Sequence, residues 1–440
     1  MRATATRPPE SVVRPAGVRS VPTTRLARPA ALLAGFAALL ASPAALLAGF
    51  AAPPARPATL LAGIAALLAR PATLLARLAG RLAGLVFLLA PVFLSAPAAG
   101  DAGSESMARG ARALWALQGA DGGWHSETYG LLRSGQSLTP FVLGPLLEVP
   151  EEIEPARPEA ARRAICFVLG GIDAEGALGR LDPMIADYPN YASALGAVVL
   201  ARAGEADAAA RIRAWLLGQQ LADALGWKPE DAAYGAWGMG GPPCRAPQTG
   251  RVDLSFTRHV LEALRACGVG AEDPALAKAA RFVARCGNPD GGFFLSPVHE
   301  EINKAGLEQG KPRSYGTATA DGALALLALG VAPEDPRLRA ATRWLVEHHR
   351  ADRVPGIPSD DDAGWAEAMH FYYLAASARA LRALAVDQAP AGRDWRVDLV
   401  AELARRQRPD GTWCSANFLM KEDDPLVATA LALRALLAAR

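Results

Sequence analysis

The sequence contains few cysteines and few aromatic residues. Its five cysteines (Cys166, Cys244, Cys267, Cys286 and Cys414) form no C-x-x-C pair and no Cys-His pair at metal-binding spacing. A disulfide framework and a cysteine-based zinc site are therefore not expected, and buried apolar thiols are favoured. Aromatic residues make up 6% of the chain, whereas Ala and Leu dominate it. This composition favours helices.

Acidic residues are almost missing from the first hundred positions. Residues 1–100 contain ten Arg, no Lys and one acid, Glu10, and so carry a formal charge of +9. Because the whole chain carries +2, residues 101–440 carry −7. The larger part of the chain has no excess positive charge to attract a polyanion, and we expect no nucleic-acid partner.

Long uninterrupted hydrophobic runs are missing from residues 28–81, where a unit of 14 residues repeats. Each unit starts with Arg-Pro or Ser-Pro and continues with a variant of Ala-Leu-Leu-Ala-Gly. The prolines keep each apolar run shorter than the ~20 residues that a membrane-spanning helix needs. Residues 1–80 are interpreted either as a low-complexity expansion or as sequence upstream of the true start.

Residues 82–101 have a different pattern, LAGLVFLLAPVFLSAPAAGD. A basic flank (Arg77 and Arg81), an apolar run and the small-residue site Ala96-Pro-Ala98 are typical of an export signal. We therefore predict that the protein is exported, or anchored to and associated with a membrane, through residues 82–98. If this segment is not a signal, a cytoplasmic location is expected. Residues 1–100 are set aside from the fold.

Three similar loops recur in the rest of the chain. They are Gln118-Gly-Ala-Asp-Gly-Gly-Trp124, Asn288-Pro-Asp-Gly-Gly-Phe293 and Gln407-Arg-Pro-Asp-Gly-Thr-Trp413. Each lies between two stretches of helical periodicity, and its Asp-Gly pair supplies a turn. Weaker loops, including one from Gln219 to Trp227, fit the same positions. Placed on this frame, paired helices give six hairpins over residues 105–440, so the predicted fold is an all-α (α/α)6 toroid.

The second helix of each hairpin is the more apolar one. Segments such as 193–201 and 425–438 have little polar surface on any side, whereas the first helices carry Arg and Glu at regular intervals. We expect the second helices to form an inner ring around a central cavity, with their N-termini converging on an acidic rim. The candidate ligand-binding residues at this rim are Asp253, Thr257, Thr319, Asp321, Trp365, His370 and Tyr372. Taken singly, the acids also fit helix N-caps, and His370 fits a core histidine.

The Gln-x-x-x-Gly-x-Trp loops and the Asp-Gly-Gly-Phe loop resemble the repeats of squalene-hopene and oxidosqualene cyclases. Residues 107–440 therefore resemble the prenyltransferase and squalene-cyclase repeat family, which implies the toroid fold. Class II terpene cyclases of this family protonate an alkene with the middle acid of a D-x-D-D motif. Ser359-Asp-Asp-Asp362 and Lys421-Glu-Asp-Asp424 approach that motif. The resemblance thus puts the candidate catalytic acid at Asp361, Asp423 or Asp424.

Two other chemistries of related toroids lack their residues here. Protein prenyltransferases hold zinc with an Asp-x-Cys phrase, and Asp321-Gly-Ala323 has Ala in place of the thiolate, so no metal site is predicted. The thioester phrase Cys-Gly-Glu-Gln is not matched by Cys286-Gly-Asn-Pro289. No cofactor is implied.

Both catalytic signatures of the family are incomplete. The first hypothesis is therefore a divergent relative that binds a ligand in an apolar cavity without catalysis. The alternative is a class II terpene cyclase-like enzyme acting on an isoprenoid substrate. In both cases the expected partner is an isoprenoid or another hydrophobic small molecule. Glycoside hydrolysis, which other α/α toroids perform with paired acids, is a third hypothesis, and the oligomeric state is left open.

Overall fold

The computed structural model describes residues 99–182, 184–388 and 392–440. The repeat at 28–81 and the signal-like segment at 82–98 lie outside the described residues, so export and membrane association stay predictions. Within the described residues, no helix is both long and apolar enough to cross a membrane.

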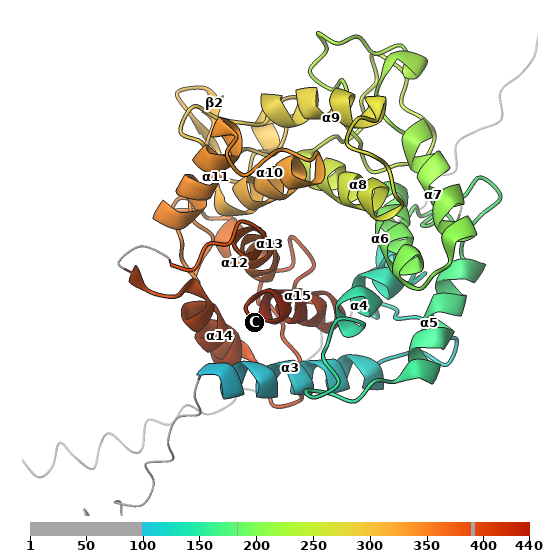
Figure 1. Ribbon diagram of the computed structural model, residues 1–440, viewed down its shortest axis with the longest axis vertical. Coiled ribbons are helices and arrows are strands. Elements are labelled where there is room, and N and C mark those ends of the chain that lie inside the picture. The colour runs from blue at the N-terminus through green and yellow to red at the C-terminus, as the bar shows by residue number, and fades with distance from the viewer. Residues whose placement is uncertain (1–98, 183, 389–391) are drawn as a thin grey trace, which may run out of the picture. The chain divides into compact units, whose positions relative to one another are not determined.

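Twelve helices of this part of the chain form two concentric rings (Figure 1). The outer ring consists of α3 (Ala99–Ala116), α5 (Pro158–Gly170), α7 (Ala206–Gly218), α9 (Pro274–Arg285), α11 (Pro336–Glu347) and α14 (Trp395–Arg406). The inner ring consists of α4 (Leu138–Leu146), α6 (Pro189–Arg202), α8 (Leu254–Ala266), α10 (Gly316–Ala328), α13 (His370–Ala383) and α15 (Pro425–Ala438). The connections add α12 (Trp365–Ala368), three 3-10 turns at Gly130–Leu132, Asp223–Leu225 and Glu300–Ile302, and an antiparallel pair of β1 (Leu307–Glu308) and β2 (Lys311–Pro312).

Each outer helix is followed by an inner helix, and the hairpins follow one another around the ring. Within the inner ring, α6 packs against α4 and α8, and α10 packs against α8 and α13. The ring closes where α15 packs against α4 and α14 packs against α3 (Figure 1). The predicted all-α (α/α)6 toroid of six hairpins is therefore confirmed.

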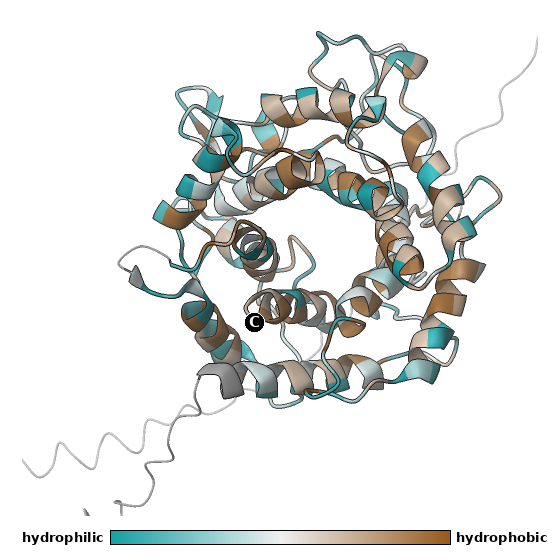
Figure 2. Ribbon diagram, viewed as in Figure 1, coloured by the Kyte–Doolittle hydropathy of each residue, from teal (hydrophilic) through white to brown (hydrophobic). Residues whose placement is uncertain are grey.

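The hydrophobic pattern decides which ring a helix joins. The outer helix α9 buries Leu276, Ala279, Phe282 and Val283, which recur every three or four residues, and exposes its polar side. The inner helix α10 buries an unbroken run from Gly316 to Leu326. Figure 2 shows the hydrophilic residues mainly on the outside of the outer ring. Burial on two sides suits the apolar sequences of inner helices such as α10, whereas the inner helices α8, α13 and α15 also carry arginines.

Aspartates stand immediately before the first residue of several helices. Asp273, Asp335 and Asp394 precede outer helices, and Asp253 and Asp424 precede inner ones; each carboxylate accepts a hydrogen bond from a backbone N–H of the first turn. Such a cap stabilises a helix start by about 0.5–2 kcal/mol. The capping role therefore accounts for Asp253 and Asp424 structurally, whatever else they do.

The glutamine loops join neighbouring hairpins. Gln118 donates through Nε2 to the carbonyl of Gly122 in its own loop and to the carbonyl of Ala160 in the next outer helix, both at 2.9 Å. Gln407 makes the equivalent pair of bonds, and its partner in the next helix is Ser106 of α3. The same side-chain contact thus links adjacent hairpins and closes the ring between its last and first hairpins.

A further glutamine loop, which follows α7, lies elsewhere than the sequence predicts. The sequence places it from Gln219 to Trp227. Instead, Gln220 donates to the carbonyls of Gly235 and Ala275, and Trp237 fills the buried tryptophan position, with Nε1 donating to Leu216 at 2.7 Å. An inserted segment separates Gln220 from Trp237, and this insertion hid the correct pairing.

A hydroxyl near the start of five inner helices fixes the loop before it. In each case the side-chain oxygen accepts a hydrogen bond of 2.9–3.2 Å from a backbone N–H of that loop. The pairs are Thr139 with Trp124, Ser193 with Leu178, Thr257 with Trp237, Thr319 with Phe293 and Thr429 with Trp413. Thr257 and Thr319 are therefore members of a repeated structural contact.

Candidate active site

A cavity of about 300 Å³ lies among the N-terminal halves of the inner helices, and all six of these helices line it. Seven of the chain's 28 Phe, Trp and Tyr residues contribute to its wall, a concentration that the overall composition does not suggest. They are Phe141, Tyr188, Tyr191, Phe256, Tyr315, Trp365 and Tyr372. This space, called here the N-terminal cavity, suits an apolar ligand.

A buried polar network closes the inner end of the N-terminal cavity. Arg258 of α8 donates through Nε to Asp321 of α10 at 3.0 Å and through Nη1 to Glu262 at 3.0 Å. The hydroxyl of Tyr372 donates to both carboxylate oxygens of Asp321, at 3.1 and 3.0 Å, and lies 2.7 Å from Ser255 Oγ. Asp321 and Tyr372 thus face the cavity from within a network that fixes their orientation.

The two carboxylates of this network have opposite pKa shifts. Burial raises the pKa of Asp321, against the effects of Arg258 and Tyr372. Burial also opposes ionisation of Glu262, but Arg258 and Arg379 together lower the pKa of Glu262 to about 2. Arg258 therefore stays charged between two carboxylates, and Asp321 is engaged as a hydrogen-bond acceptor.

Asp253 offers a carboxyl group with one oxygen free to react. Its Oδ1 accepts from the Phe256 N–H at 2.9 Å, while its Oδ2 has no hydrogen-bond partner in the described chain and lies 3.9 Å from Arg251 Nε. Burial raises the pKa of Asp253 to about 6, despite the Phe256 bond and the nearby charges of Arg251 and Lys304. A side chain in this state holds a proton in a sizeable fraction of molecules near neutral pH and can donate it.

Glu422 is a third buried carboxyl in the cavity wall, after Asp321 and Asp253. It is 1% exposed, and its two oxygens accept from the backbone N–H groups of Phe371 and Tyr372, both at 2.8 Å. Burial raises the pKa of Glu422 to about 8, against these two bonds. Because both oxygens are engaged at the start of α13, this side chain acts first as a cap for that helix.

Three cationic side chains also line the N-terminal cavity: Arg251, Lys304 and Lys421. Lys304 Nζ lies 3.8 Å from the ring centroid of Trp365, and Lys421 Nζ lies 5.6 Å from that of Tyr188. Burial, reinforced by Arg251, lowers the pKa of Lys304 to about 8. These three side chains are exposed or partly exposed, and they mark the open side of the cavity, called here its mouth. The mouth therefore carries cations close to the Asp253 carboxyl, whereas the sequence predicts an acidic rim.

The three predicted catalytic acids do not line the cavity. Asp361 accepts from the backbone N–H groups of Ala363 and Trp365 and so fixes the loop before α12. Asp423 accepts from the hydroxyl of Tyr129, and Asp424 caps α15 while accepting from Ser126. Each carboxylate is already engaged by donors of its own loop or of a neighbouring one.

The predicted ligand-binding residues divide into two groups. Asp253, Asp321, Trp365 and Tyr372 line the N-terminal cavity together. Thr257, Thr319 and His370 do not. The threonines hold the loops described above, and the side chain of His370, the first residue of α13, lies beside Glu402 of the outer helix α14.

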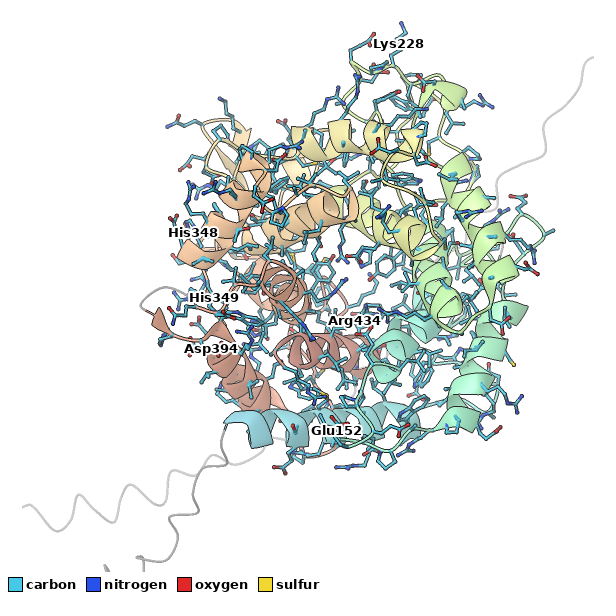
Figure 3. All side chains as sticks on the ribbon, in the orientation of Figure 1. Glu152, Lys228, His348, His349, Asp394 and Arg434 are labelled. Atoms are coloured by element: carbon cyan, nitrogen blue, oxygen red, sulfur yellow. The ribbon has the colours of Figure 1, made fainter. Side chains whose placement is uncertain are left out.

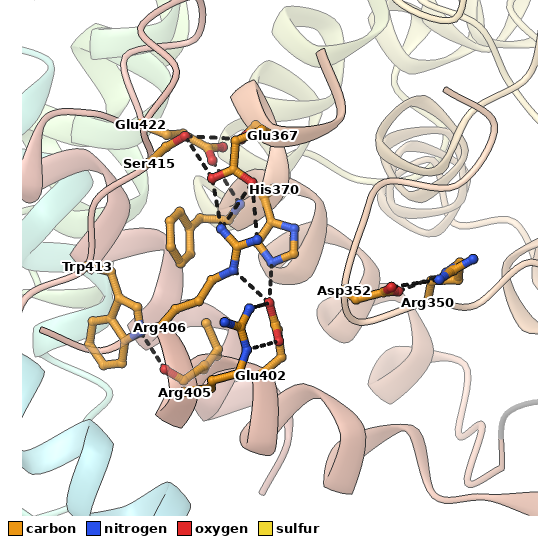
Figure 4. A network of polar contacts seen from close by, with 12 residues as sticks. Arg350, Asp352, Glu367, His370, Glu402, Arg405, Arg406, Trp413, Ser415 and Glu422 are labelled. Carbon is orange, nitrogen blue, oxygen red and sulfur yellow. Dashed lines mark hydrogen bonds and ion pairs between the residues drawn. The ribbon is translucent and has the colours of Figure 1, made fainter. Parts of the chain in front are cut away.

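The surroundings of His370 are ionic (Figure 4). Its Nε2 lies 3.7 Å from Glu402 Oε1, and Arg406 binds both Glu402 and Glu367 beside it. Burial, together with Arg406, lowers the pKa of His370 to about 4. The imidazole is thus a neutral group behind the cavity wall.

Sequence reasoning missed five charged residues of the site: Arg258, Glu422, Arg251, Lys304 and Lys421. A signal existed for the first, since Arg258 and Glu262 stand four residues apart in a segment that the sequence places in the inner ring. Glu422 lies inside the Lys421-to-Asp424 motif, but the motif directed attention to its last two acids. Within the described residues, no group of three His, Cys, Asp or Glu side chains is placed to hold a metal ion.

Comparison with known proteins places the fold. No family model matches the sequence, and no curated protein matches it significantly. Solved structures do match. A variant of the type II terpene cyclase MstE from Scytonema, in complex with its substrate geranylgeranyl dihydroxybenzoate, is 15% identical with a TM-score of 0.51, covering 77% of this chain and 97% of that one. MstE without ligand is 14% identical with a TM-score of 0.50, covering 77% and 98%. At this identity the likeness concerns the fold, which is that of the terpene-cyclase toroids.

Proposed function

We propose that this toroid is a type II terpene cyclase-like enzyme that cyclises a polyprenyl chain bearing an anionic head group. The observation that carries the proposal is Asp253, a buried carboxyl with a raised pKa and a free Oδ2 in an aromatic cavity. The fold of MstE, a type II terpene cyclase, supports it.

The chemistry needs a carboxyl group that keeps its proton near neutral pH and faces the alkene that receives it. The proton on Asp253 is transferred to one alkene carbon, where a C–H bond forms from the π electrons while the O–H bond breaks. A carbocation and the Asp253 carboxylate result, and the next double bond closes a ring on the cation. A C–H bond next to the last cation then breaks, its electron pair forms the new alkene, and its proton passes to water; water in turn returns one proton to the Asp253 carboxylate. The net change is an isomerisation that needs no co-reactant.

The cavity wall supplies what a carbocation requires. Aromatic faces attract cations, with a gain of about 0.5–2 kcal/mol for each good contact, and they cannot capture the cation as water does. Tyr191 and Phe256 pack edge to face in this wall, with centroids 6.4 Å apart. The Asp321 carboxylate adds a fixed negative group at the inner end.

The mouth of the cavity selects the head group. Arg251, Lys304 and Lys421 are suited to a carboxylate or phosphate that remains at the mouth while the apolar tail enters. The substrate of MstE, geranylgeranyl dihydroxybenzoate, has this form: a prenyl chain on a benzoate.

The test is turnover by the purified protein. Geranylgeranyl dihydroxybenzoate and geranylgeranyl diphosphate would be incubated with it, and the products analysed by mass spectrometry. Cyclised product is expected from the wild type and not from Asp253→Asn, which keeps a capping oxygen. Asp335→Asn, at the cap of outer helix α11, is the matched control and should stay active. Absence of cyclised product from both substrates would contradict the proposal.

A second candidate function is binding without catalysis. It is favoured by the positions of Asp361, Asp423 and Asp424, which accept hydrogen bonds from loop residues and do not line the N-terminal cavity. Saturable binding of these prenyl compounds without turnover, lost in Lys304→Met, would support this function over the first.

A further inference from the structure

A second cavity, of about 510 Å³, lies at the opposite end of the ring of inner helices from the N-terminal cavity. Residues near the C-terminal ends of these helices line it, and four of them are arginines: Arg202, Arg379, Arg382 and Arg434. We call this space the arginine chamber. Its volume lies within the range of about 300–1,000 Å³ that is usual for small-molecule sites.

The chamber contains more positive charge than its acids balance. Glu148 is paired with Arg202, and Glu262 is shared by Arg379 and Arg258. Arg382 and Arg434 have no carboxylate within 4.0 Å in the described part of the chain. Two guanidinium groups are therefore left without an anionic partner.

Arg434 is the more confined of the two. Figure 3 shows it inside the ring of inner helices. Its Nη2 donates to the carbonyl of Phe141 at 2.8 Å, and its buried Nε has no hydrogen-bond partner in the described structure. Burial, with repulsion from Arg379 and Arg258, lowers the pKa of Arg434 to about 10, so the group is still charged at neutral pH.

The C-terminal ends of the inner helices offset part of this positive charge. Helix C-termini carry partial negative charge, and Arg382 donates to the carbonyl of Leu437 at 2.6 Å. A guanidinium has five N–H donors, and one carbonyl uses one of them. The remaining donors of Arg382 and Arg434 are suited to a planar or tetrahedral oxyanion.

We infer that the arginine chamber binds a phosphate-class anion, as an organic phosphate or diphosphate, through Arg434 and Arg382. The lining also includes the apolar side chains of Leu195, Val198 and Val199 on α6, against which the organic part of such a ligand would pack. The site is separate from the N-terminal cavity, because Arg258 and Asp321 lie between them, and the inference does not depend on the proposed cyclase activity.

The experiment is calorimetric titration of the protein with inorganic diphosphate at constant ionic strength. The expected result is saturable binding that Arg434→Gln and Arg382→Gln each weaken by at least about tenfold. Arg382 is exposed, so its substitution should not disturb folding. Arg162→Gln, on the exposed face of outer helix α5, is the matched control and should bind as the wild type does.

The mouth cations are the main competing site, and Lys304→Met separates the two. Binding that persists in Lys304→Met and is lost in the two arginine variants supports the chamber. Binding that is lost in Lys304→Met and retained in Arg434→Gln, or no binding at all, would overturn the inference. Thermal unfolding of each variant shows whether the fold is retained.

Discussion

Arg258 of α8 places both Nε and Nη2 within 3.0 Å of one oxygen of Asp321 on α10. The two residues are 2% and 3% exposed, and the same guanidinium reaches Glu262 on its other side. Asp321 lines the N-terminal cavity, whereas Glu262 lines the arginine chamber. This pair therefore forms part of the partition between two spaces of opposite character, one aromatic and one rich in arginine.

Removing the cation from this partition should cost much of the domain's stability. In Arg258→Met, Asp321 would be left buried without its ion pair, and Glu262 would retain only Arg379. Breaking a buried pair in this way typically costs about 3–5 kcal/mol. Urea denaturation measures the change. Arg162→Gln, which breaks an exposed pair with Glu159, should leave the free energy of unfolding almost unchanged, because an exposed ion pair contributes little. Equal effects of the two substitutions would contradict the assignment.

Asp253 should make stability depend on pH in the direction opposite to most carboxylates. Its folded-state pKa, about 6, lies above its ordinary value of 3.8, so the folded state holds the proton more tightly. The contribution to stability is present below pH 3.8 and is lost as the pH rises to about 6. Asp253→Asn should therefore be more stable than the wild type at pH 8, by about 1–3 kcal/mol, and not at pH 4. The control Asp335→Asn should lose stability at pH 8, because hydrogen bonding to Arg337 lowers the pKa of Asp335 to about 2.

If Asp253 is the acid, the proposed reaction should also report its pKa. The active form is protonated, so kcat/KM should fall as the pH rises through about 6. A midpoint near 8, abolished in Glu422→Gln, would instead assign the acid to Glu422, whose pKa burial raises to about 8. The pH profile of product formation for the wild type and the Glu422→Gln variant decides between them.

Thr257 should matter for folding and not for ligand binding. Its hydroxyl accepts from the backbone N–H of Trp237 and donates to the carbonyl of Asp253. Thr257→Val keeps the shape but leaves the buried N–H unpaired, at a cost of about 1–3 kcal/mol. Thr257→Ser keeps the hydroxyl and should lose less. Denaturant unfolding compares the two, and normal stability of the valine variant would refute the structural role.

The sequence predicts the fold well because the relevant signals are local. Helical periodicity separates inner from outer helices, and the Asp-Gly turns in loops such as Gln118 to Trp124 mark the hairpins. These patterns depend on residues a few positions apart, and each repeat provides an independent instance. The one misplaced loop, at Gln220, is the one that an insertion separates from its tryptophan.

The site is predicted less well because it is assembled from distant segments. Arg251, Lys304 and Lys421 come from three different loops, and no local pattern shows that they meet at one mouth. Acids near the helix starts, such as Asp424, cannot be divided by sequence into caps and cavity residues, since an N-cap has the same signature in both cases. The sequence does identify Asp253 and Asp321, because Asp253 stands at the start of an inner helix, Asp321 lies within one, and the inner helices line the cavity.

The mouth cations should act on the head group of the substrate and not on the chemistry. Lys304 lies over Trp365 at the cavity wall, where its charge is partly desolvated and so interacts strongly with an anion. In Lys304→Met, KM for a prenyl compound with a carboxylate should rise by about tenfold, while kcat stays within about twofold of the wild-type value. Squalene has no anionic group, so any turnover of it should not change. Arg162→Gln is the matched surface control. If the substitution lowers kcat and leaves KM unchanged, Lys304 acts on the reacting part of the chain, and the head-group assignment is wrong.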